Sequence, residues 1–151
     1  MIPRPLVQAV AASALILGSA SAQITNNTAN YKQETAGVRD FKLGATSVKV
    51  LIDSTTLGGG ELEMAHLTFA PGQTPRSHAH RRVEVLYVLS GELDHVVNGV
   101  SHVLKPGMAG IVRPGDQVMH RVPGSDSVKV LVIWAPGGEL ARIAPPQPSR
   151  P

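Results

Sequence analysis

From Ser47 onward, short apolar segments alternate with turns that contain glycine and proline. The segments are rich in valine, isoleucine and leucine, and their sequences are SVKVLID, ELEMAHLTF, VEVLYVL, HVVNGVSHVL, AGIVR, QVMHRV and VKVLVIW. Segments of this length and composition predict an all-β sandwich or barrel. Asn98-Gly99 favours a two-residue hairpin turn inside the fourth segment. No long window has a helical period, and only residues 139–143 suggest a short helical turn.

Residues 1–22 have the layout of a secretory signal. One basic residue, Arg4, precedes an apolar run from Leu6 to Leu17, and Ala-Ser-Ala stands just before Gln23. The run is shorter than the ~20 residues that a membrane-spanning helix needs. We therefore expect no membrane anchor, but a protein that is exported to the periplasm or the medium and cleaved after Ala22.

A chain of 151 residues can bury one sizeable core but is too short for two ordinary domains. The expected organisation is the signal, an N-terminal arm at residues 23–46, one β-barrel domain at residues 47–143, and a tail at residues 144–151. The arm begins polar and aperiodic, with the sequence QITNNTANYKQETA. The tail, APPQPSRP, contains too many prolines to supply the hydrogen-bond donors of a strand.

The charge and cysteine counts exclude several classes of partner and site. The formal net charge is +3, and loss of the signal with its one charged residue reduces it further. This weak, scattered excess does not favour binding to nucleic acid or to an anionic membrane. The chain has no cysteine, so it has no disulfide and no thiolate ligand. Any metal site must use histidine, aspartate, glutamate or neutral oxygen ligands.

The segment from Pro71 to Leu93, PGQTPRSHAHRRVEVLYVLSGEL, contains the strongest candidate for such a site. Side chains alternate across a strand, so in an extended segment His78, His80 and Glu84 would project from one face. Neutral imidazole and carboxylate suit divalent Mn, Fe, Ni, Cu or Zn. An isolated pair of histidines among arginines is equally consistent with a surface loop. Spacing within these seven residues leaves both interpretations open.

The wider segment resembles the first motif of the cupin family without a mismatch. Its positions are Gly72, His78, His80, Glu84 and Gly91, separated by five, one, three and six residues. The second cupin motif usually has the form G-x5-P-x-G-x2-H-x3-N. Here it begins at Gly107 and departs at three points: Arg113 replaces proline, His120 comes two residues late, and Gly124 stands where asparagine is common. The resemblance extends from about Leu62 to Trp134.

The resemblance implies a small jelly-roll β-barrel with one divalent transition metal inside it. The metal would be held by His78, His80 and Glu84 of the first motif and by His120 of the second. The other histidines are not expected to touch it. His66 is expected to be an ordinary strand residue, and His95 and His102, which flank the hairpin, are expected to face solvent or a subunit partner.

The strand that follows the expected ligands has two faces, because residues an even number of positions from them lie on their side and the others lie on the opposite side. One face, with Arg82, Leu86, Val88 and Ser90, would point inward. The opposite face, with Val83, Val85, Tyr87 and Leu89, is too apolar for open water. A strand that is apolar on both faces is buried on both. We therefore expect a homodimer that covers the outward face.

Three histidines and one glutamate leave one or two positions free on a metal that takes five or six ligands. Members of the cupin family catalyse oxidative cleavage, decarboxylation, isomerisation or elimination, and others only bind ligands. Trp134-Ala135-Pro136-Gly137-Gly138 resembles the closing turn of small quercetin-dioxygenase-like cupins. This favours a metal-dependent, dioxygenase-like oxidoreductase acting on a small oxygenated organic compound, with Glu84 as ligand or proton acceptor.

Two other functions remain open on the sequence. The first is a lyase or isomerase acting on a sugar acid, whose carboxylate would be held by Arg113 or Arg121 beside the second motif. The second is a ligand-binding module without catalysis. Fold resemblance does not choose among these functions.

Overall fold

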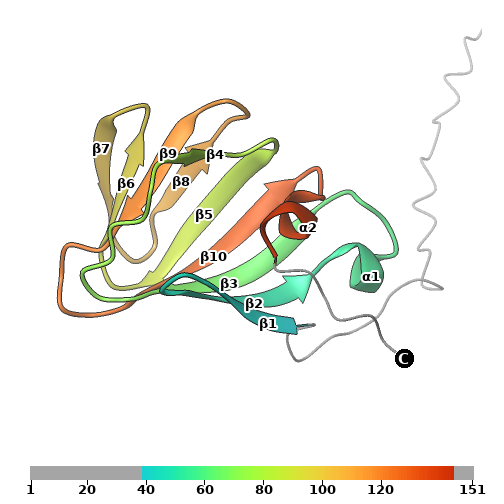
Figure 1. The fold of residues 1–151 in the computed structure, drawn as a ribbon, viewed down its shortest axis with the longest axis horizontal. Coiled ribbons are helices and arrows are strands. Elements are labelled where there is room, and N and C mark those ends of the chain that lie inside the picture. The colour runs from blue at the N-terminus through green and yellow to red at the C-terminus, as the bar shows by residue number, and fades with distance from the viewer. Residues whose placement is uncertain (1–38, 145–151) are drawn as a thin grey trace, which may run out of the picture.

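The computed structural model describes residues 39–144, which form two antiparallel β-sheets around one core (Figure 1). One sheet has the order β1-β2-β3-β10-β5-β8 and the other the order β4-β9-β6-β7. The strands are β1 (Arg39–Leu43), β2 (Thr46–Ile52), β3 (Glu63–Phe69), β4 (His78–Ala79), β5 (Val83–Ser90), β6 (Leu93–Val97), β7 (Val100–Leu104), β8 (Ala109–Val112), β9 (Gln117–Arg121) and β10 (Val128–Ala135). Two short helices, α1 (Ser54–Leu57) and α2 (Glu139–Ile143), complete the described chain. The predicted all-β class is confirmed.

The sheet begins earlier in the chain than the sequence suggested. Strand β1 pairs with β2 from Arg39 opposite Val50 to Leu43 opposite Thr46. The expected arm at residues 23–46 is therefore wrong for residues 39–46. Strand β1 has a neighbour on one side only, and its alternating polar residues are tolerated there because they face solvent. Residues 1–38, with the expected signal and most of the arm, and residues 145–151 of the expected tail lie outside the described part.

Alternation along the strands builds the core between the two sheets. In β3, every second residue is buried, and β10 follows the same pattern. Buried residues of the larger sheet pack against Leu93, Leu104 and Val122 from the opposite side. The two expected faces of β5 are also present, since Leu86 and Val88 are buried.

The hairpin between β6 and β7 turns at the expected dipeptide. Asn98 and Gly99 have φ values of 50° and 82°, the left-handed region that a type I′ turn needs at both positions. The Asn98 side chain also donates a hydrogen bond to Asp116 Oδ1 at 2.8 Å and accepts one from the Gln117 amide at 3.0 Å. These contacts attach the hairpin to the turn between β8 and β9.

A glycine of the first motif, Gly91, has a structural role in the turn between β5 and β6. Its φ is 80°, and a β-carbon at this position would lie 2.8 Å from the Ser127 carbonyl oxygen and 3.0 Å from Val128 Cα. Only glycine meets both requirements without moving the backbone. Gly91 therefore lets this turn pack closely against the beginning of β10.

The short turn expected at residues 139–143 is confirmed as α2, which lies at the end of β10 (Figure 1). Leu140 is fully buried, and its amide donates to Glu63 Oε2 at 2.8 Å. The Gly137 amide donates to the Gly60 carbonyl at 2.8 Å. These contacts fix α2 against β3. Neither α1 nor α2 is long and apolar enough to cross a membrane.

Candidate metal centre

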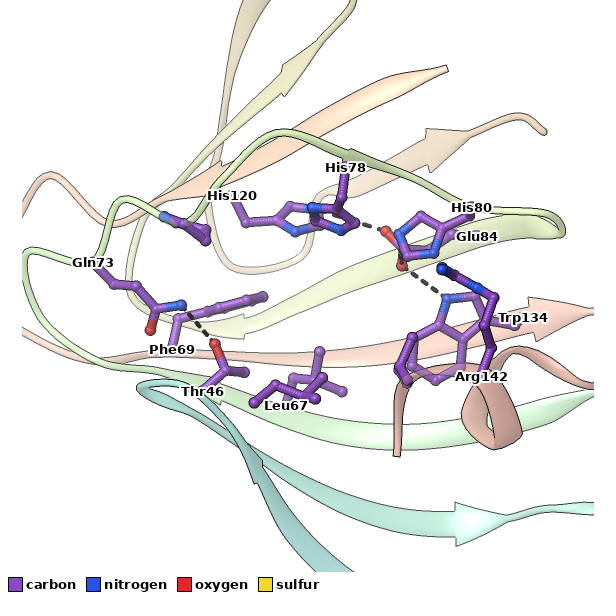
Figure 2. A pocket seen from close by; sticks show the side chains of 13 residues that line it. Thr46, Leu67, Phe69, Gln73, His78, His80, Glu84, His120, Trp134 and Arg142 are labelled. Carbon is purple, nitrogen blue, oxygen red and sulfur yellow. Dashed lines mark hydrogen bonds and ion pairs between the residues drawn. The ribbon is translucent and has the colours of Figure 1, made fainter. Parts of the chain in front are cut away.

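Four side chains from three strands and a loop meet at one end of the space between the sheets (Figure 2). They are the four expected ligands: His78 on β4, His80 just after it, Glu84 on β5 and His120 on β9. The centre of the His78 ring lies 4.9 Å from that of the His80 ring and 5.9 Å from that of the His120 ring. Glu84 lies between two imidazoles, with Oε2 at 3.1 Å from His80 Nε2 and Oε1 at 3.5 Å from His120 Nε2.

The first motif reaches this arrangement by changing sheets, and not by running along one strand. His78 pairs with Val118 in the smaller sheet, whereas Glu84 pairs with Val112 and Trp134 in the larger one. The expectation that one extended segment projects all three side chains from one face is therefore wrong. The chain crosses between the sheets around residues 80–82, so the two histidines and the glutamate approach the same space from different directions.

Three buried atoms in this group have no hydrogen-bond partner: His80 Nε2, Glu84 Oε1 and His120 Nε2. Each of these residues is at most 5% exposed. A buried polar atom without a partner costs about 1–3 kcal/mol, so native proteins satisfy nearly all of them with protein, water or an ion. Two neutral imidazoles and a carboxylate that face one another are a donor set for a divalent transition metal. The residues therefore fit the metal that the sequence pattern predicts.

The donors converge without closing completely on a common point. Within residues 39–144, no group of three or more His, Asp or Glu side chains is already arranged as a set of metal ligands. Metal binding by the four residues accordingly stays a prediction. The separations of 3.1 Å and 3.5 Å around Glu84 suit neighbouring donors of one metal, since atoms bound to it at about 2.0–2.2 Å lie roughly 3 Å apart.

Burial controls the protonation of the group. Burial lowers the pKa of His80 and lowers that of His120 well below its usual value, where His95, His78 and His80 add to the effect. Burial also raises the pKa of Glu84 to about 7, although a hydrogen bond from Trp134 acts in the opposite direction. Neutral imidazole is the form that binds metals. His80 and His120 are thus kept in the binding form near neutral pH, while metal-free Glu84 is close to its titration point.

Trp134 on β10 fixes the carboxylate from the other side. Its indole nitrogen donates to Glu84 Oε2 at 2.9 Å, and the ring is almost fully buried. The bond holds Oε2 and leaves Oε1 directed towards His120 (Figure 2). The carboxylate therefore has a defined orientation before any ligand arrives.

A cavity of about 420 Å³ opens beside the four side chains. Its walls are mainly apolar and include Leu43, Leu67, Phe69, Pro75, Trp134 and Ile143. Away from the histidines, a polar pair interrupts the apolar lining: Gln73 Nε2 donates to Thr46 Oγ1 at 2.6 Å. The size and lining are typical of sites for small organic molecules with few polar groups.

Comparison with known proteins identifies the domain that contains these side chains. Residues 65–134 match the family model of the cupin domain, Cupin_2. This domain belongs to the cupin superfamily. No protein with a curated description matches the sequence.

Solved structures support the same fold. An RmlC-like cupin from Shewanella frigidimarina is 22% identical, with a TM-score of 0.59 over 72% of this chain and 92% of that one. KdgF from a Halomonas species is 16% identical, with a TM-score of 0.56 over 68% and 94%. The polyketide cyclase RemF from Streptomyces resistomycificus is 22% identical, with a TM-score of 0.55 over 60% and 65%. At these identities the likeness concerns the jelly-roll fold alone, and it confirms that expectation for this cupin.

His95 of this cupin lies where the sequence did not place it. Its expected exposure to solvent or to a partner is wrong, because it is 3% exposed and its ring stacks on that of His120 at 5.2 Å and 13°. The two residues are opposite one another in the β6–β9 pairing. A β-carbon on Gly110 would lie 2.8 Å from the His95 ring, so the glycine makes room for it. Side chains two positions apart on a strand point to the same side. The sequence could therefore have placed His95 on the buried side together with Leu93.

The remaining two histidines stay away from the cavity. His102 is exposed on β7, as expected. His66 is half-buried on β3, opposite Lys49 and Leu131 in the neighbouring strands. Neither residue lines the cavity beside the four candidate ligands.

The two arginines expected to hold a substrate do not line this cavity. Arg121 follows His120 on β9 and therefore points to the opposite face, where its Nε donates to Asp94 Oδ2 at 2.8 Å. Arg113 is exposed in the turn between β8 and β9 and lines a different cavity. The expectation for both is corrected. Arg142 of α2, which no sequence pattern indicated, does line the cavity.

Proposed function

We propose that this cupin is an exported, metal-dependent oxidoreductase of the dioxygenase-like kind, acting on a small oxygenated organic compound. The proposal is supported mainly by the buried donor atoms without partners on His80, Glu84 and His120, which lie beside a largely apolar cavity. Export rests on the pattern of residues 1–22 and stays a prediction, since these residues lie outside the described part.

In this proposal, His78, His80, Glu84 and His120 hold one divalent transition metal. A metal held by four protein ligands supplies a Lewis-acid centre with positions left for oxygen donors. The metal identity, whether Fe, Mn, Ni, Cu or Zn, is not fixed by the donor set. Iron, copper or nickel would favour oxygen chemistry.

The other residues of the site determine what such a centre would meet. Apolar side chains such as Leu67 and Phe69 exclude water and favour a compound with an apolar body. Gln73 and Thr46 offer a polar contact away from the histidines. Glu84, a ligand of the metal in this proposal, presents a carboxylate that is suited to accept a proton from an enol or phenol in the cavity. The mainly apolar lining favours phenolic or enolic compounds over polyhydroxylated sugar acids, and Arg142, the arginine of the lining, is already paired with Glu139.

Oxygen consumption tests the proposal. Protein loaded in turn with Fe²⁺, Mn²⁺, Ni²⁺, Cu²⁺ or Zn²⁺ is mixed with a catechol, a flavonol or a β-diketone, and dissolved oxygen is followed with an electrode. We expect uptake above the buffer rate with at least one metal, and loss of that uptake in a His120→Ala variant. Turnover of a uronate without oxygen would replace the proposal with a lyase or isomerase. Tight binding without any turnover would replace it with a binding module.

We also propose that the cupin forms a homodimer through the outward face of β5. Tyr87 and Leu89 are 43% and 45% exposed in the single chain, and Ile111, on the neighbouring strand β8, is 47% exposed. Val85 pairs with Ile111, so the apolar surface continues from one strand to the next. A patch of this kind on a symmetric interface would be buried against its own copy.

The dimer is expected to depend on Tyr87. A Tyr87→Glu substitution places a charge at the centre of the patch, so the molar mass from light scattering should fall from that of two chains to that of one at micromolar concentration. Tyr87→Phe keeps the apolar ring and should remain dimeric. A parent protein that is already monomeric at this concentration contradicts the proposal.

A further inference from the structure

We propose that Glu139, on α2, is a positioning residue that fixes the ring orientation and tautomer of His80. The inference rests on the proposed metal site, in which His80 is a ligand. It makes the C-terminal helix part of the machinery that binds the metal. Neither the sequence pattern of the two motifs nor the family match, which ends at residue 134, includes this helix.

The His80 ring lies between two carboxylates. Glu139 Oε1 is 2.9 Å from His80 Nδ1, and Glu84 Oε2 is 3.1 Å from His80 Nε2. All three residues are buried. The contact with Glu84 lacks the geometry of a hydrogen bond, since Nε2 has no partner, whereas the contact with Glu139 has it. The two nitrogens of the ring are therefore in different situations.

An ionised carboxylate only accepts hydrogen bonds, so Nδ1 must carry the proton in this contact. In a neutral imidazole, Nε2 then has the free lone pair, and this nitrogen faces Glu84 and the cavity. A carboxylate on the distal nitrogen of a ligating histidine also increases the basicity of the ring and holds its orientation. Glu139 thus prepares His80 to bind through Nε2.

Glu139 is itself held in its ionised form. Arg142, one turn further along α2, donates from Nε to Glu139 Oε1 at 2.9 Å and contacts the same oxygen through Nη2. The Arg81 amide donates to Oε2 at 3.4 Å. Arg142 also donates to the Ala79 carbonyl at 3.2 Å, which connects α2 to β4.

The helix has anchors other than Glu139. Leu140 is fully buried, and its amide is bound to Glu63, a second buried carboxylate that contacts none of the four candidate ligands. Gly137 is bound to Gly60. These anchors separate the docking of α2 from the orientation of His80. A substitution at Glu139 can therefore be compared with one at Glu63.

The experiment uses Glu139→Gln with Glu63→Gln as the matched control. The glutamine at position 63 keeps an oxygen that accepts from the Leu140 amide. Zn²⁺ affinity is measured by competition with a chelating dye, and the His80 tautomer of the metal-free protein by ¹⁵N NMR of its ring nitrogens. We expect Glu139→Gln to weaken Zn²⁺ binding ~10–100-fold and to give a mixture of tautomers. Glu63→Gln should keep the affinity and the Nδ1–H tautomer of the parent.

The two readouts separate this inference from the proposed function. If the parent binds no Zn²⁺, Mn²⁺ or Fe²⁺, the proposed function fails, and the tautomer comparison still decides the role of Glu139. If the parent binds metal and Glu139→Gln matches it in both affinity and tautomer, the positioning role is overturned while the metal site stands. Equal losses of affinity in both variants would also overturn it, because they would indicate a general effect of loosening α2.

Discussion

Replacing His80 with alanine is expected to remove nearly all metal from the purified protein. The parent should carry about one divalent transition metal per chain, and His80→Ala close to none after dialysis against metal-free buffer. Loss of a group outside the ligand shell already costs ~10–100-fold in affinity, and His80 is proposed as a direct ligand. Its removal would also take away the nitrogen that lies 3.1 Å from Glu84 Oε2. Elemental analysis by mass spectrometry measures the result.

The control is His66→Ala. His66 is half-buried on β3 and does not line the cavity, so its removal should leave the metal content at the parent level. Circular dichroism of both variants shows whether the β-sheets have formed. Equal metal content in the parent and in folded His80→Ala would remove the metal site from this end of the barrel.

The second large effect concerns the stability of the metal-free protein as pH changes. Burial raises the pKa of Glu84 to about 7 in the folded protein, above the usual 4.5 of a solvated glutamate. Between these two pH values the folded state keeps a proton that the unfolded chain has lost. The free energy of unfolding therefore falls as pH rises through this window. At 1.36 kcal/mol per pKa unit, the contribution of Glu84 decreases by about 3 kcal/mol by the upper end of the window.

The buried histidines act in the opposite direction. The pKa values of His80, His95 and His120 are lowered by burial, so below their usual value of 6.5 the unfolded chain binds protons that the folded state does not. Their contribution to stability is present above that pH and is lost as pH falls. In the parent, the contribution of these histidines to the free energy of unfolding partly cancels the change that comes from Glu84. The effect of Glu84 is therefore isolated by comparing the parent with a variant.

Glu84→Gln provides that comparison because glutamine has the shape of the protonated acid and does not titrate. Relative to the parent, its free energy of unfolding should increase by about 3 kcal/mol between pH 5 and pH 8. Urea denaturation of both proteins in the presence of a chelator measures the difference. Parallel pH profiles would mean that Glu84 has an ordinary pKa in the folded state, and that the carboxylate is better solvated than its burial indicates.

The features that the sequence predicted correctly are those that depend on a few neighbouring residues. The first motif identified His78, His80 and Glu84, and the structure brings them together with His120 despite the two-residue extension of the second motif. Glycine and asparagine identified the hairpin, because the φ values of its turn are a local property. These features depend on a few consecutive residues and survive without knowledge of the whole fold.

What the sequence did not predict depends on distant parts of the chain. Glu139 is 59 positions from His80, and only the docking of α2 against β3 brings the two together. Arg142 reaches the cavity for the same reason. The crossing between sheets after His80 also has no local signal, since both flanking segments are extended. Arg121 is different: alternation from His120 already indicates that it points away, and proximity in sequence to a motif was a poor guide to proximity in space.

The position of β10 determines when the fold can form. This last strand lies between β3 and β5, and it pairs with both along most of its length (Figure 1). Until residues 128–135 are available, β3 and β5 each keep an open edge of unpaired amides and carbonyls, and such edges associate readily with other chains. Pairings at this sequence separation also slow folding, because a long loop must close before the contacts form. Aggregation during refolding should therefore depend on how fast β10 inserts between β3 and β5. Conditions that keep the open edges of different chains apart should improve the yield of folded protein.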